Sequence, residues 1–519
     1  MRVFVLGELL SAETFDVGCD VDALLGAIHA ANANGVADVI VLAAGCTYSL
    51  MAIDNDTDCP NGLPSIISPI SIYGNGATIM RSPAAAEFRI FHVGASGTLM
   101  LRNLTLAGGI QACADFSFNV GGAIVNFGTL RLEDCTVRDH SAGMGGGIAN
   151  AGDATLIDCT VRDNFAGSGG GIDNLGALEL VHSTVRDNDA SDGGGICNDG
   201  TATLVDSTIS ANSGPLWGGG LVNGGTATLV GCTLESNTSA FGGGLINAGE
   251  LILTRCTVHG NSAVADGDYG GIGGGIYNNG PAEIACCTIS GNSATNEAAG
   301  VYNDDAVALN NVTIATNTAG ADGGGIYTCT SGAVELKNTL IADNTATTGP
   351  DCAGTLTSYG HNMIGNNDGC TLIPTTGDQV GTSAHPIDPL LDRLQDNGGP
   401  TETHALLSGS PAIDAGSCTD ISGAPITADQ RGDPRPAPLG GNCDIGAYEV
   451  KQACAHGDIN GDGAIDLLDV VLCTQIAQGH ITGSATQRAA ADVDSDSGVD
   501  ADDVRILSEY VLGIRSALP

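Results

Sequence analysis

Two short acidic segments near the end of this 519-residue chain have the spacing of calcium-binding loops. In each, oxygen ligands fall at loop positions 1, 3, 5, 7, 9 and 12, and position 7 contributes its backbone carbonyl. These positions are Asp458, Asn460, Asp462, Ala464, Asp466 and Asp469 in the first loop, and Asp492, Asp494, Asp496, Gly498, Asp500 and Asp503 in the second. Because the pattern occurs twice, we predict two Ca²⁺ sites rather than an acidic, solvated tail.

The two loops differ at position 6, where calcium loops turn sharply. The first loop has Gly463 at this position, whereas the second has Ser497. A non-glycine residue in the left-handed conformation costs on the order of 1 kcal/mol. We therefore expect the second site to bind calcium more weakly.

Three aspartates in the middle of the chain, Asp139, Asp163 and Asp187, are 24 residues apart. If successive repeats stack as parallel strands, neighbouring carboxylates would stand about 5 Å apart, close to the separation in retaining glycosidases. Asp163 and Asp187 are therefore candidate catalytic residues. Each aspartate directly follows an arginine, however, and the pattern repeats without a break. We favour a ladder of neutralised charges, with no catalytic residue, over a catalytic pair.

Aromatic residues offer one further candidate site. Aromatics make up only 4% of the chain, and Trp217, the single tryptophan, occupies a position equivalent to that of Phe241 one repeat later. Two such rings could stack against a sugar, but we favour packing at a turn. No arginine or lysine beside calcium-binding carboxylates marks the cleft of a lyase.

The charge of the chain limits its partners. Acidic residues outnumber basic ones 59 to 17, which gives a formal net charge of −42. A field of this sign repels nucleic acid and anionic membranes, and it repels polyuronates unless calcium bridges the two. We therefore expect no nucleic-acid partner.

Cysteine content favours an oxidising compartment. The chain has 18 cysteines but no C-x-x-C pair, so disulfides or buried thiols are expected rather than zinc sites. Plausible local bridges are Cys352 with Cys370, Cys418 with Cys443, and Cys454 with Cys473. Together with the repeat described next, this predicts an extracellular or cell-surface protein.

The sequence contains no evident membrane span or signal peptide. No run of about 20 apolar residues exists, so we predict no membrane span. Residues 1–11 are apolar but short and are interrupted by Glu8, so a signal peptide is not evident. Since other features favour export, we expect that the start codon is placed too late or that the chain is truncated.

A repeat of 24 or 25 residues, with one step of 31, dominates the chain. Each unit reads roughly G-G-G-[IL]-x-N, then a strand, then C/S-T-[VIL]-x-x-N, and its apolar pivot falls at Ile124, Ile148, Ile172, Ile196, Leu221, Leu245, Ile276, Val301 and Ile326. The units are too short for a βαβ crossover and contain β-branched runs between Gly and Asn turns. We predict an all-β, right-handed parallel β-helix solenoid with three strands per turn.

Stacking of such coils predicts columns of identical side chains. One asparagine column runs through Asn126, Asn150, Asn174, Asn198, Asn223, Asn247, Asn278 and Asn303, and a second through Asn164, Asn188, Asn212, Asn237, Asn261, Asn292, Asn317 and Asn344. Amide ladders of this kind satisfy backbone groups at tight bends. A third column, in which Ser183 and Ser207 replace cysteine, holds Cys135, Cys159, Cys232, Cys256 and Cys287, and we interpret it as small interior residues.

Residues 22–34 read as a short amphipathic helix that covers the first coil, with Leu24, Leu25 and Ile28 on one face. This segment (DALLGAIHAAN at 22–32), Cys19 and AGCTY at 44–48 resemble the N-terminal cap of bacterial right-handed β-helix surface proteins of the pectate-lyase-like superfold. The segments SPAIDAG at 410–416, DQRG at 429–432 and DIGAYE at 444–449 resemble the closing segment of choice-of-anchor β-helix proteins.

The two calcium loops, each ending in Asp and followed by an apolar helical run, resemble a type I dockerin module. That resemblance implies an EF-hand-like, all-α calcium-binding domain and a cohesin-type protein partner. In dockerins, loop positions 10 and 11 are associated with cohesin recognition. Here they are Leu467 and Leu468 in the first loop and Ala501 and Asp502 in the second, rather than the familiar Ser-Thr pair.

These observations predict four parts: a cap at 1–50, β-helix coils at 51–350, a closing segment at 351–450 and a dockerin-like domain at 451–519. We interpret the chain as a secreted or cell-surface scaffold or adhesin that docks to a cohesin-type partner. One alternative is a polysaccharide-degrading hydrolase or lyase of a cellulosome-like complex, because dockerins commonly accompany such enzymes. A carbohydrate-binding module is the other alternative.

Overall fold

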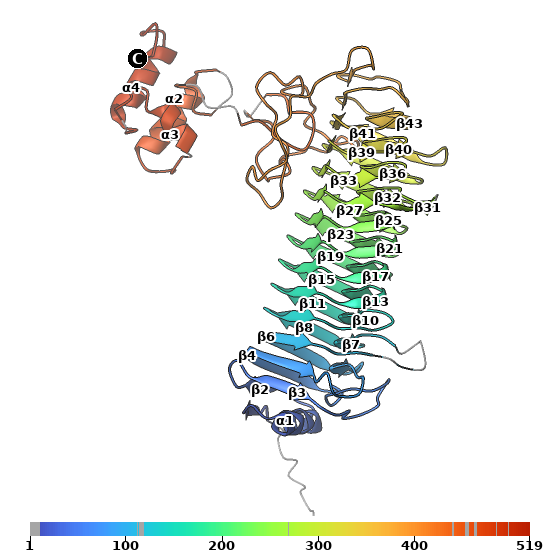
Figure 1. Ribbon diagram of the computed structural model, residues 1–519. Coiled ribbons are helices and arrows are strands. Elements are labelled where there is room, and N and C mark those ends of the chain that lie inside the picture. Colours follow the sequence, from blue (N-terminus) through green and yellow to red (C-terminus); the bar gives the residue numbers. More distant parts are fainter. Residues whose placement is uncertain are drawn as a thin grey trace, which may run out of the picture.

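The computed structural model describes residues 11–111, 113, 119–267, 269–437, 441–451, 456–460, 464–483, 485–496 and 498–518. Within these residues, short parallel strands stack into a long solenoid, and three helices follow near the C-terminus (Figure 1). The parallel β-helix solenoid with a small helical region is therefore confirmed.

Most of the solenoid consists of four vertical stacks of strands. The first stack contains β5 (Phe91–Val93), β7 (Ile124–Asn126), β10 (Ile148–Asn150), β14 (Ile172–Asn174), β18 (Ile196–Asn198), β22 (Leu221–Asn223), β26 (Leu245–Asn247), β32 (Ile276–Asn278), β36 (Val301–Asn303), β40 (Ile326–Thr328) and part of β43 (Cys352–Ser358). The second contains β8 (Thr129–Glu133), β11 (Asp153–Ile157), β15 (Ala177–Val181), β19 (Thr201–Val205), β23 (Thr226–Val230), β27 (Glu250–Thr254), β33 (Ala282–Ala285), β37 (Ala306–Asn310) and β41 (Ala333–Lys337).

The third stack contains β9 (Thr136–Arg138), β12 (Thr160–Arg162), β16 (Thr184–Arg186), β20 (Thr208–Ser210), β24 (Thr233–Glu235), β28 (Thr257–His259), β34 (Thr288–Ser290), β38 (Thr313–Ala315), β42 (Leu340–Ala342), β44 (Met363–Ile364) and β46 (Gln379–Val380). The fourth contains β13 (Phe165–Ser168), β17 (Asp189–Asp192), β21 (Ser213–Trp217), β25 (Thr238–Phe241), β29 (Ser262–Ala263), β35 (Ser293–Ala294) and β39 (Thr318–Ala319). A further strand, β45 (Cys370–Leu372), pairs with β43.

Central coils thus have four strands, not the three that the sequence predicted. The second and third stacks are separated by a residue in the left-handed conformation, such as Asp158 (φ 52°), which bends the chain sharply between β11 and β12. Because a bend at one residue ends the regular extended backbone, one long strand becomes two. The seven-residue excess in one repeat forms a small antiparallel hairpin of β30 (Ala265–Asp266) and β31 (Tyr269–Gly270).

The repeat register is as the sequence predicted. Ile148 pairs with Ile172, and Ile172 with Ile196, as direct parallel partners, and all three side chains are fully buried. Columns of Ile, Leu and Val therefore form one continuous core through the solenoid. The core does not need a large aromatic cluster, because the apolar side chains of each coil pack against those of the coils above and below it.

Both asparagine ladders form. In the first, the amide of Asn150 donates to Oδ1 of Asn174 at 2.7 Å, and Asn174 donates in turn to Asn198. In the second, Asn164 donates to Asn188 at 2.9 Å. Each ladder amide also bonds backbone carbonyls of neighbouring turns, so polar groups inside tight bends are satisfied.

The N-terminal end of the solenoid is closed by helix α1 (Val21–Asn34). Asp20 caps the start of α1, Gly35 ends it in the left-handed conformation, and Leu24 and Ile28 are fully buried. Beneath α1 lie β1 (Thr14–Val17), β2 (Asp38–Leu42), β3 (Thr47–Leu50), β4 (Pro69–Arg81) and β6 (Thr98–Ala107), which pair in parallel. The predicted cap helix is therefore present.

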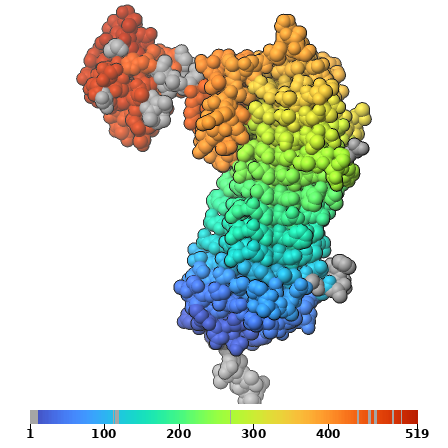
Figure 2. Space-filling model, in the orientation of Figure 1, coloured from blue at the N-terminus to red at the C-terminus, as the bar shows by residue number. Residues whose placement is uncertain are grey.

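Beyond β46 the chain folds back along the flank of the solenoid, as the orange segment in Figure 2 shows. We call residues 381–437 and 441–450 the flanking segment. Gln430, which is fully buried, donates to Thr257 on β28 and accepts from Thr288 on β34. The flanking segment thereby joins coils formed more than 100 residues earlier in the chain.

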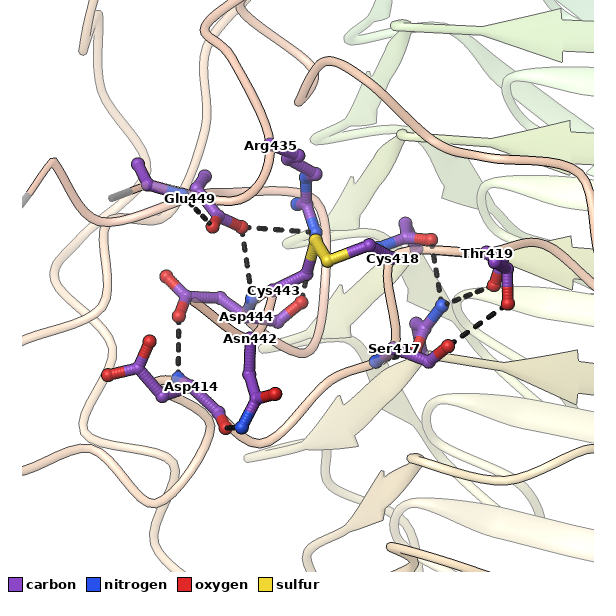
Figure 3. Close-up of a disulfide and its surroundings, with 12 residues drawn as sticks. Asp414, Ser417, Cys418, Thr419, Arg435, Asn442, Cys443, Asp444 and Glu449 are labelled. Atoms are coloured by element: carbon purple, nitrogen blue, oxygen red, sulfur yellow. Dashed lines mark hydrogen bonds and ion pairs between the residues drawn. A yellow bond between two sulfur atoms is a disulfide. The ribbon is translucent and has the colours of Figure 1, made fainter. Parts of the chain in front are cut away.

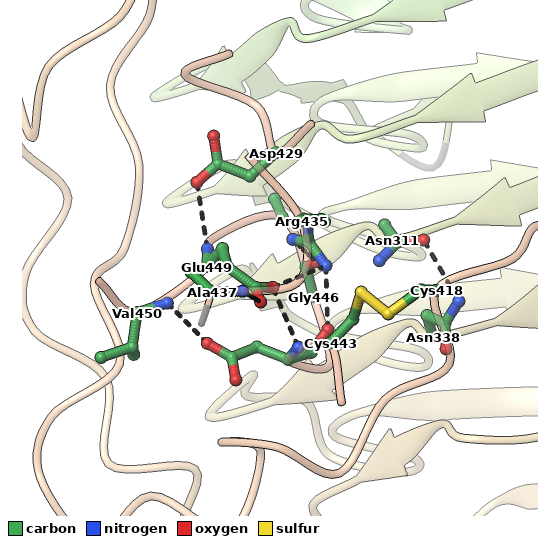
Figure 4. Close-up of polar contacts among 12 residues, drawn as sticks. Asn311, Asn338, Cys418, Asp429, Arg435, Ala437, Cys443, Gly446, Glu449 and Val450 are labelled. Carbon is green, nitrogen blue, oxygen red and sulfur yellow. Dashed lines mark hydrogen bonds and ion pairs between the residues drawn. A yellow bond between two sulfur atoms is a disulfide. The ribbon is translucent and has the colours of Figure 1, made fainter. Parts of the chain in front are cut away.

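A disulfide and a buried ionic cluster fix the flanking segment. Cys418 and Cys443 form the bridge that lies beside the strands in Figure 3. Next to it, the carboxylate of Glu449 accepts from the backbone N–H of Asp444 at 2.9 Å and lies 3.5 Å from the Arg435 guanidinium (Figure 4). Both charged side chains are almost completely buried.

Two of the three suggested disulfides form, Cys352–Cys370 and Cys418–Cys443. The third does not match the structure, since Cys473 is a free, buried cysteine packed in the helical core, and Cys454 lies outside the described residues. Two further bridges, Cys19–Cys46 and Cys59–Cys113, were not predicted. The predicted interior column of cysteines is present as free, buried thiols.

Candidate functional site

The second acidic loop joins α3 (Ala485–Ala491) to α4 (Ala501–Val511). Carboxylate oxygens of Asp492, Asp494 and Asp496 lie within 4.8 Å of one another. The backbone N–H of Asp496 donates to Oδ1 of Asp492 at 3.0 Å and to Oδ1 of Asp494 at 3.2 Å, so the loop curls around these oxygens. Three carboxylates at this spacing repel one another, and an all-oxygen donor set suits Ca²⁺. The residues therefore fit a calcium ion.

The end of the same loop is built into the start of α4. Asp500 caps the helix by accepting from Asp502 N–H at 2.8 Å, and Asp503 accepts from Asp500 N–H at 2.8 Å. The other oxygen of Asp503 accepts from Asp494 N–H at 3.3 Å. Asp503 is fully buried, so one side chain ties loop positions 3, 9 and 12 together.

The first loop repeats this arrangement at the start of α2 (Leu467–Ala477). Asp466 caps α2, and fully buried Asp469 accepts from Ile459, Asn460 and Asp466 N–H groups at 2.7, 3.0 and 2.9 Å. Asp458 and Ala464 belong to the same loop, while Asp462, Gly463 and the Ser497 of the second loop lie outside the described residues. The structure thus gives both loops the same capped helix start.

Helices α2 and α4 pack together around a small apolar core of their own. Its buried members include Ile459, Cys473, Ile476, Val493 and Leu507, which come from both loops and both helices. Because the loops and the helices share this core, ordering of the loops and packing of the helices are coupled.

The residues at loop positions 10 and 11 differ sharply between the two halves. Leu467 is 68% exposed and Leu468 is 58% exposed at the start of α2. At the equivalent point of α4, Asp502 bonds Arg505 at 3.2 Å. One half therefore presents an apolar surface and the other a charged one.

On the solenoid, Asp139, Asp163 and Asp187 all occupy left-handed turn positions. The carboxylate of each forms an ion pair with the arginine that precedes it. The three pairs follow one another up the coils as an exposed charge ladder.

Sequence reasoning missed a different aspartate, Asp173 on β14. Its side chain is only 6% exposed, it accepts from Ser168 Oγ at 3.2 Å, and burial raises its pKa to about 6. In neighbouring coils the same position, directly after the apolar pivot, holds Ala149 and Cys197. The signal in the sequence was a charged residue in an otherwise uncharged column.

Comparisons with known proteins give one family match and two distant structural similarities. Residues 456–512 match the family model described as Dockerin type I domain. The chain is 14% identical to the A-module of the mannuronan C-5 epimerase AlgE6 of Azotobacter vinelandii, with a TM-score of 0.42, over 69% of this chain and 93% of that one. It is 13% identical to pectate lyase Pel9A, with a TM-score of 0.35, over 85% of this chain and 97% of that one.

Among the curated proteins, no match to the chain was found. Within the described residues, none of the helices has both the length and the apolarity that crossing a bilayer requires. Dockerin domains of this type bind calcium and attach to cohesin modules, as the loops of residues 456–512 led us to expect. The chain therefore consists of a parallel β-solenoid followed by a type I dockerin domain at residues 456–512.

Proposed function

We propose that this protein is an exported β-solenoid that attaches, through its calcium-bound dockerin domain, to a partner carrying a cohesin-type module. The main support is the duplicated loop in which a buried aspartate at position 12 bonds the backbone of its own loop, inside the dockerin match. Four disulfides among the described residues favour an oxidising, extracellular setting.

Two calcium ions are assigned in this proposal. Asp458, Asn460, Asp462, Ala464, Asp466 and Asp469 would hold the first, and Asp492, Asp494, Asp496, Gly498, Asp500 and Asp503 the second. Bound calcium neutralises carboxylates that otherwise repel one another. The capped starts of α2 and α4 are then free to pack on their shared core.

Contact with the cohesin partner is proposed to involve α2. Leu467, Leu468 and Val471 are exposed on this helix at 68, 58 and 45%. Burying such apolar side chains against a partner is favourable, whereas the Asp502–Arg505 pair on α4 would first lose its hydration. We therefore expect a partner surface with an apolar patch.

The solenoid is proposed to be a non-catalytic adhesive or scaffold surface. The observation that favours this role is the regular ladder of ion pairs at Asp139, Asp163 and Asp187, which neutralises each candidate carboxylate. A general acid or nucleophile requires an environment that separates it from its equivalents in other coils. Uniform columns are instead typical of an extended binding surface.

Calcium titration of the full chain tests the attachment. We expect a calcium-dependent gain in helicity and two binding events, of which Asp494→Asn removes one and Asp458→Asn the other. Cohesin capture on a panel of type I modules should be lost with chelator and reduced by Leu468→Asp, but not by Asp502→Ala.

Asp189→Asn, an exposed change on the solenoid, serves as the charge-matched control. Unchanged helicity on adding calcium would refute the calcium assignment. The non-catalytic role would be refuted if the protein cleaved a polysaccharide, releasing new sugar ends, and the Asp187→Asn variant did not.

A further inference from the structure

On the outer surface of the first stack, the middle residues of β7, β10 and β14 line a pocket of about 130 Å³ together with residues from the two flanking turns. We call Val125, Ala149, Asp173, Cys197 and Val222 the floor column, since they are successive partners in the register. The wall column beside it consists of Met144, Ser168, Asp192, Trp217 and Phe241.

The wall column changes from a small acidic side chain, Asp192, to the aromatic Trp217 in the next coil. Trp217 stacks on Phe241, with ring centroids 4.6 Å apart and an interplanar angle of 21°, so one face of the indole is covered. In the preceding coil its register partner is Asp192, whose side chain is far smaller than an indole. Trp217 is 36% exposed. The second face of the indole lies toward Asp192, whose smaller side chain covers less of the ring than Phe241 does.

Three carboxylates lie near the change from Asp192 to Trp217 in the wall column. Asp173, in the floor column, is only 6% exposed and accepts a hydrogen bond from Ser168 Oγ. Asp192 has one buried oxygen, Oδ1, without a hydrogen-bond partner among the described residues. Asp199 is an exposed turn residue whose Oδ1 lies next to Gly224, in the coil that contains Trp217.

Three negative charges influence the Cys197 thiol. Burial, together with Asp173, Asp199 and Asp192, raises the pKa of the Cys197 thiol to about 12. Cys197 stands on the floor between Asp173 and the Trp217 coil. Asp173 is the register partner of Cys197, and Asp192 precedes Cys197 in the same coil, whereas Asp199 is an exposed turn residue.

This cluster differs from the charge ladder on the solenoid surface. In the described part of the chain, no arginine or lysine forms a salt bridge with Asp173, Asp192 or Asp199, whereas Asp163 and Asp187 are each paired. Among the described residues, the acidic side chains whose oxygens lie within 4.8 Å of one another are Asp492, Asp494 and Asp496 of the dockerin domain, so the cluster near Trp217 does not have the spacing of a metal site. A buried carboxylate without a compensating charge destabilises the fold, so Asp173, which lines the pocket, is a candidate ligand-binding group.

We propose that Trp217 with Asp173, Asp192 and Asp199 forms a subsite for one sugar ring of a glycan that carries no negative charge. The indole face toward Asp192 would pack against the C–H face of the ring, and the carboxylates would accept hydrogen bonds from its hydroxyl or ammonium groups. The inference rests on the proposed adhesive role of the solenoid and names its ligand class. Uronates and sulfated sugars are excluded by the three carboxylates and the net charge of −42.

Trp217 is the only tryptophan of the chain, so its emission reports on this subsite alone. The full chain is titrated with neutral xylan, mannan and β-glucan oligosaccharides, with chitosan oligosaccharides, and with oligogalacturonate. We expect a saturable change in tryptophan emission with a neutral or an amino sugar, and none with oligogalacturonate. Comparing the neutral and the amino sugars shows whether hydroxyl or ammonium groups are the hydrogen-bond donors. The affinity from calorimetry should match that from fluorescence.

Matched variants separate the subsite from the rest of the surface. Trp217→Ala should weaken binding about tenfold, and Asp192→Asn should weaken it while retaining the emission signal. Phe165→Ala, an exposed aromatic on β13, and Asp189→Asn, on the same strand as Asp192, should leave affinity unchanged.

Equal loss in the control variants, unchanged affinity in Trp217→Ala, preference for oligogalacturonate, or no emission change with any glycan would each overturn the proposal. The titration is repeated with chelator, because binding at Trp217 should persist when calcium is removed. Failure of docking and failure of this subsite are thus distinguished.

Discussion

At the scale of single residues, the solenoid depends on buried polar side chains whose conformation is fixed by hydrogen bonds to both neighbouring coils. Asn198 is fully buried; its amide donates to Asn223 Oδ1 at 2.8 Å, and its own Oδ1 accepts from Asn174. Buried amides of this kind are stabilising only while every partner is present. Cysteine at the interior column is different, because Ser183 already replaces it there and makes equivalent bonds to carbonyl oxygens.

Asn198→Ala should therefore lower the free energy of unfolding by about 2–3 kcal/mol, since it leaves buried groups on both neighbouring coils without partners. Urea denaturation followed by circular dichroism measures the change. Cys232→Ser, in the interior cysteine column, is the control and should cost less than about 1 kcal/mol. Equal stabilities for the two variants would contradict the role assigned to the ladder.

At the scale of elements, the flanking segment is held by charges that are removed from water. The Glu449 side chain is 1% exposed, and burial raises its pKa to about 7, although the Arg435 guanidinium acts in the opposite direction. Burial likewise raises the pKa of Asp444, whose backbone N–H donates to Glu449. Protonation of this cluster therefore favours the folded state.

The expected pH dependence follows from the higher pKa of Glu449 in the folded state. Below the unfolded value of 4.5 the stabilisation is fully present, and it is lost as the pH rises through about 7. Its size is about 3 kcal/mol. Thermal unfolding of the full chain in calcium should thus occur at a lower temperature at pH 8 than at pH 5, and Glu449→Gln should reduce that difference. Glu250→Gln, at an exposed site, should leave it unchanged.

At the scale of the whole molecule, the protein is a capped rod with an attachment domain at one end. Helix α1 covers the first coil, the flanking segment lies along the last ones, and α2 to α4 form a separate group (Figure 1). An uncovered solenoid end would expose strand edges and an apolar layer. The cap therefore keeps copies of the rod from stacking end to end.

Replacing Ile28 with aspartate should release α1 from the first coil, because it introduces a charge at a fully buried position. We expect association into higher oligomers, measured by size-exclusion chromatography with light scattering. Ala30→Asp, on the exposed face of the same helix, should remain monomeric. A folded, monomeric Ile28→Asp protein would show that the cap has no such role.

Local and periodic information in the sequence was sufficient for the coils, the asparagine ladders, the α1 cap and the dockerin loops. Each of these features depends on spacings of 2 to 31 residues, so a pattern of residue types indicates the contact directly. The tertiary structure alone decided where the flanking segment lies, which cysteines pair at the N-terminal end, and what faces Asp173. The contacts of the flanking segment and the N-terminal disulfides join residues whose separation follows no period, and the exposure of Trp217 and the burial of Asp173 depend on how the coils pack.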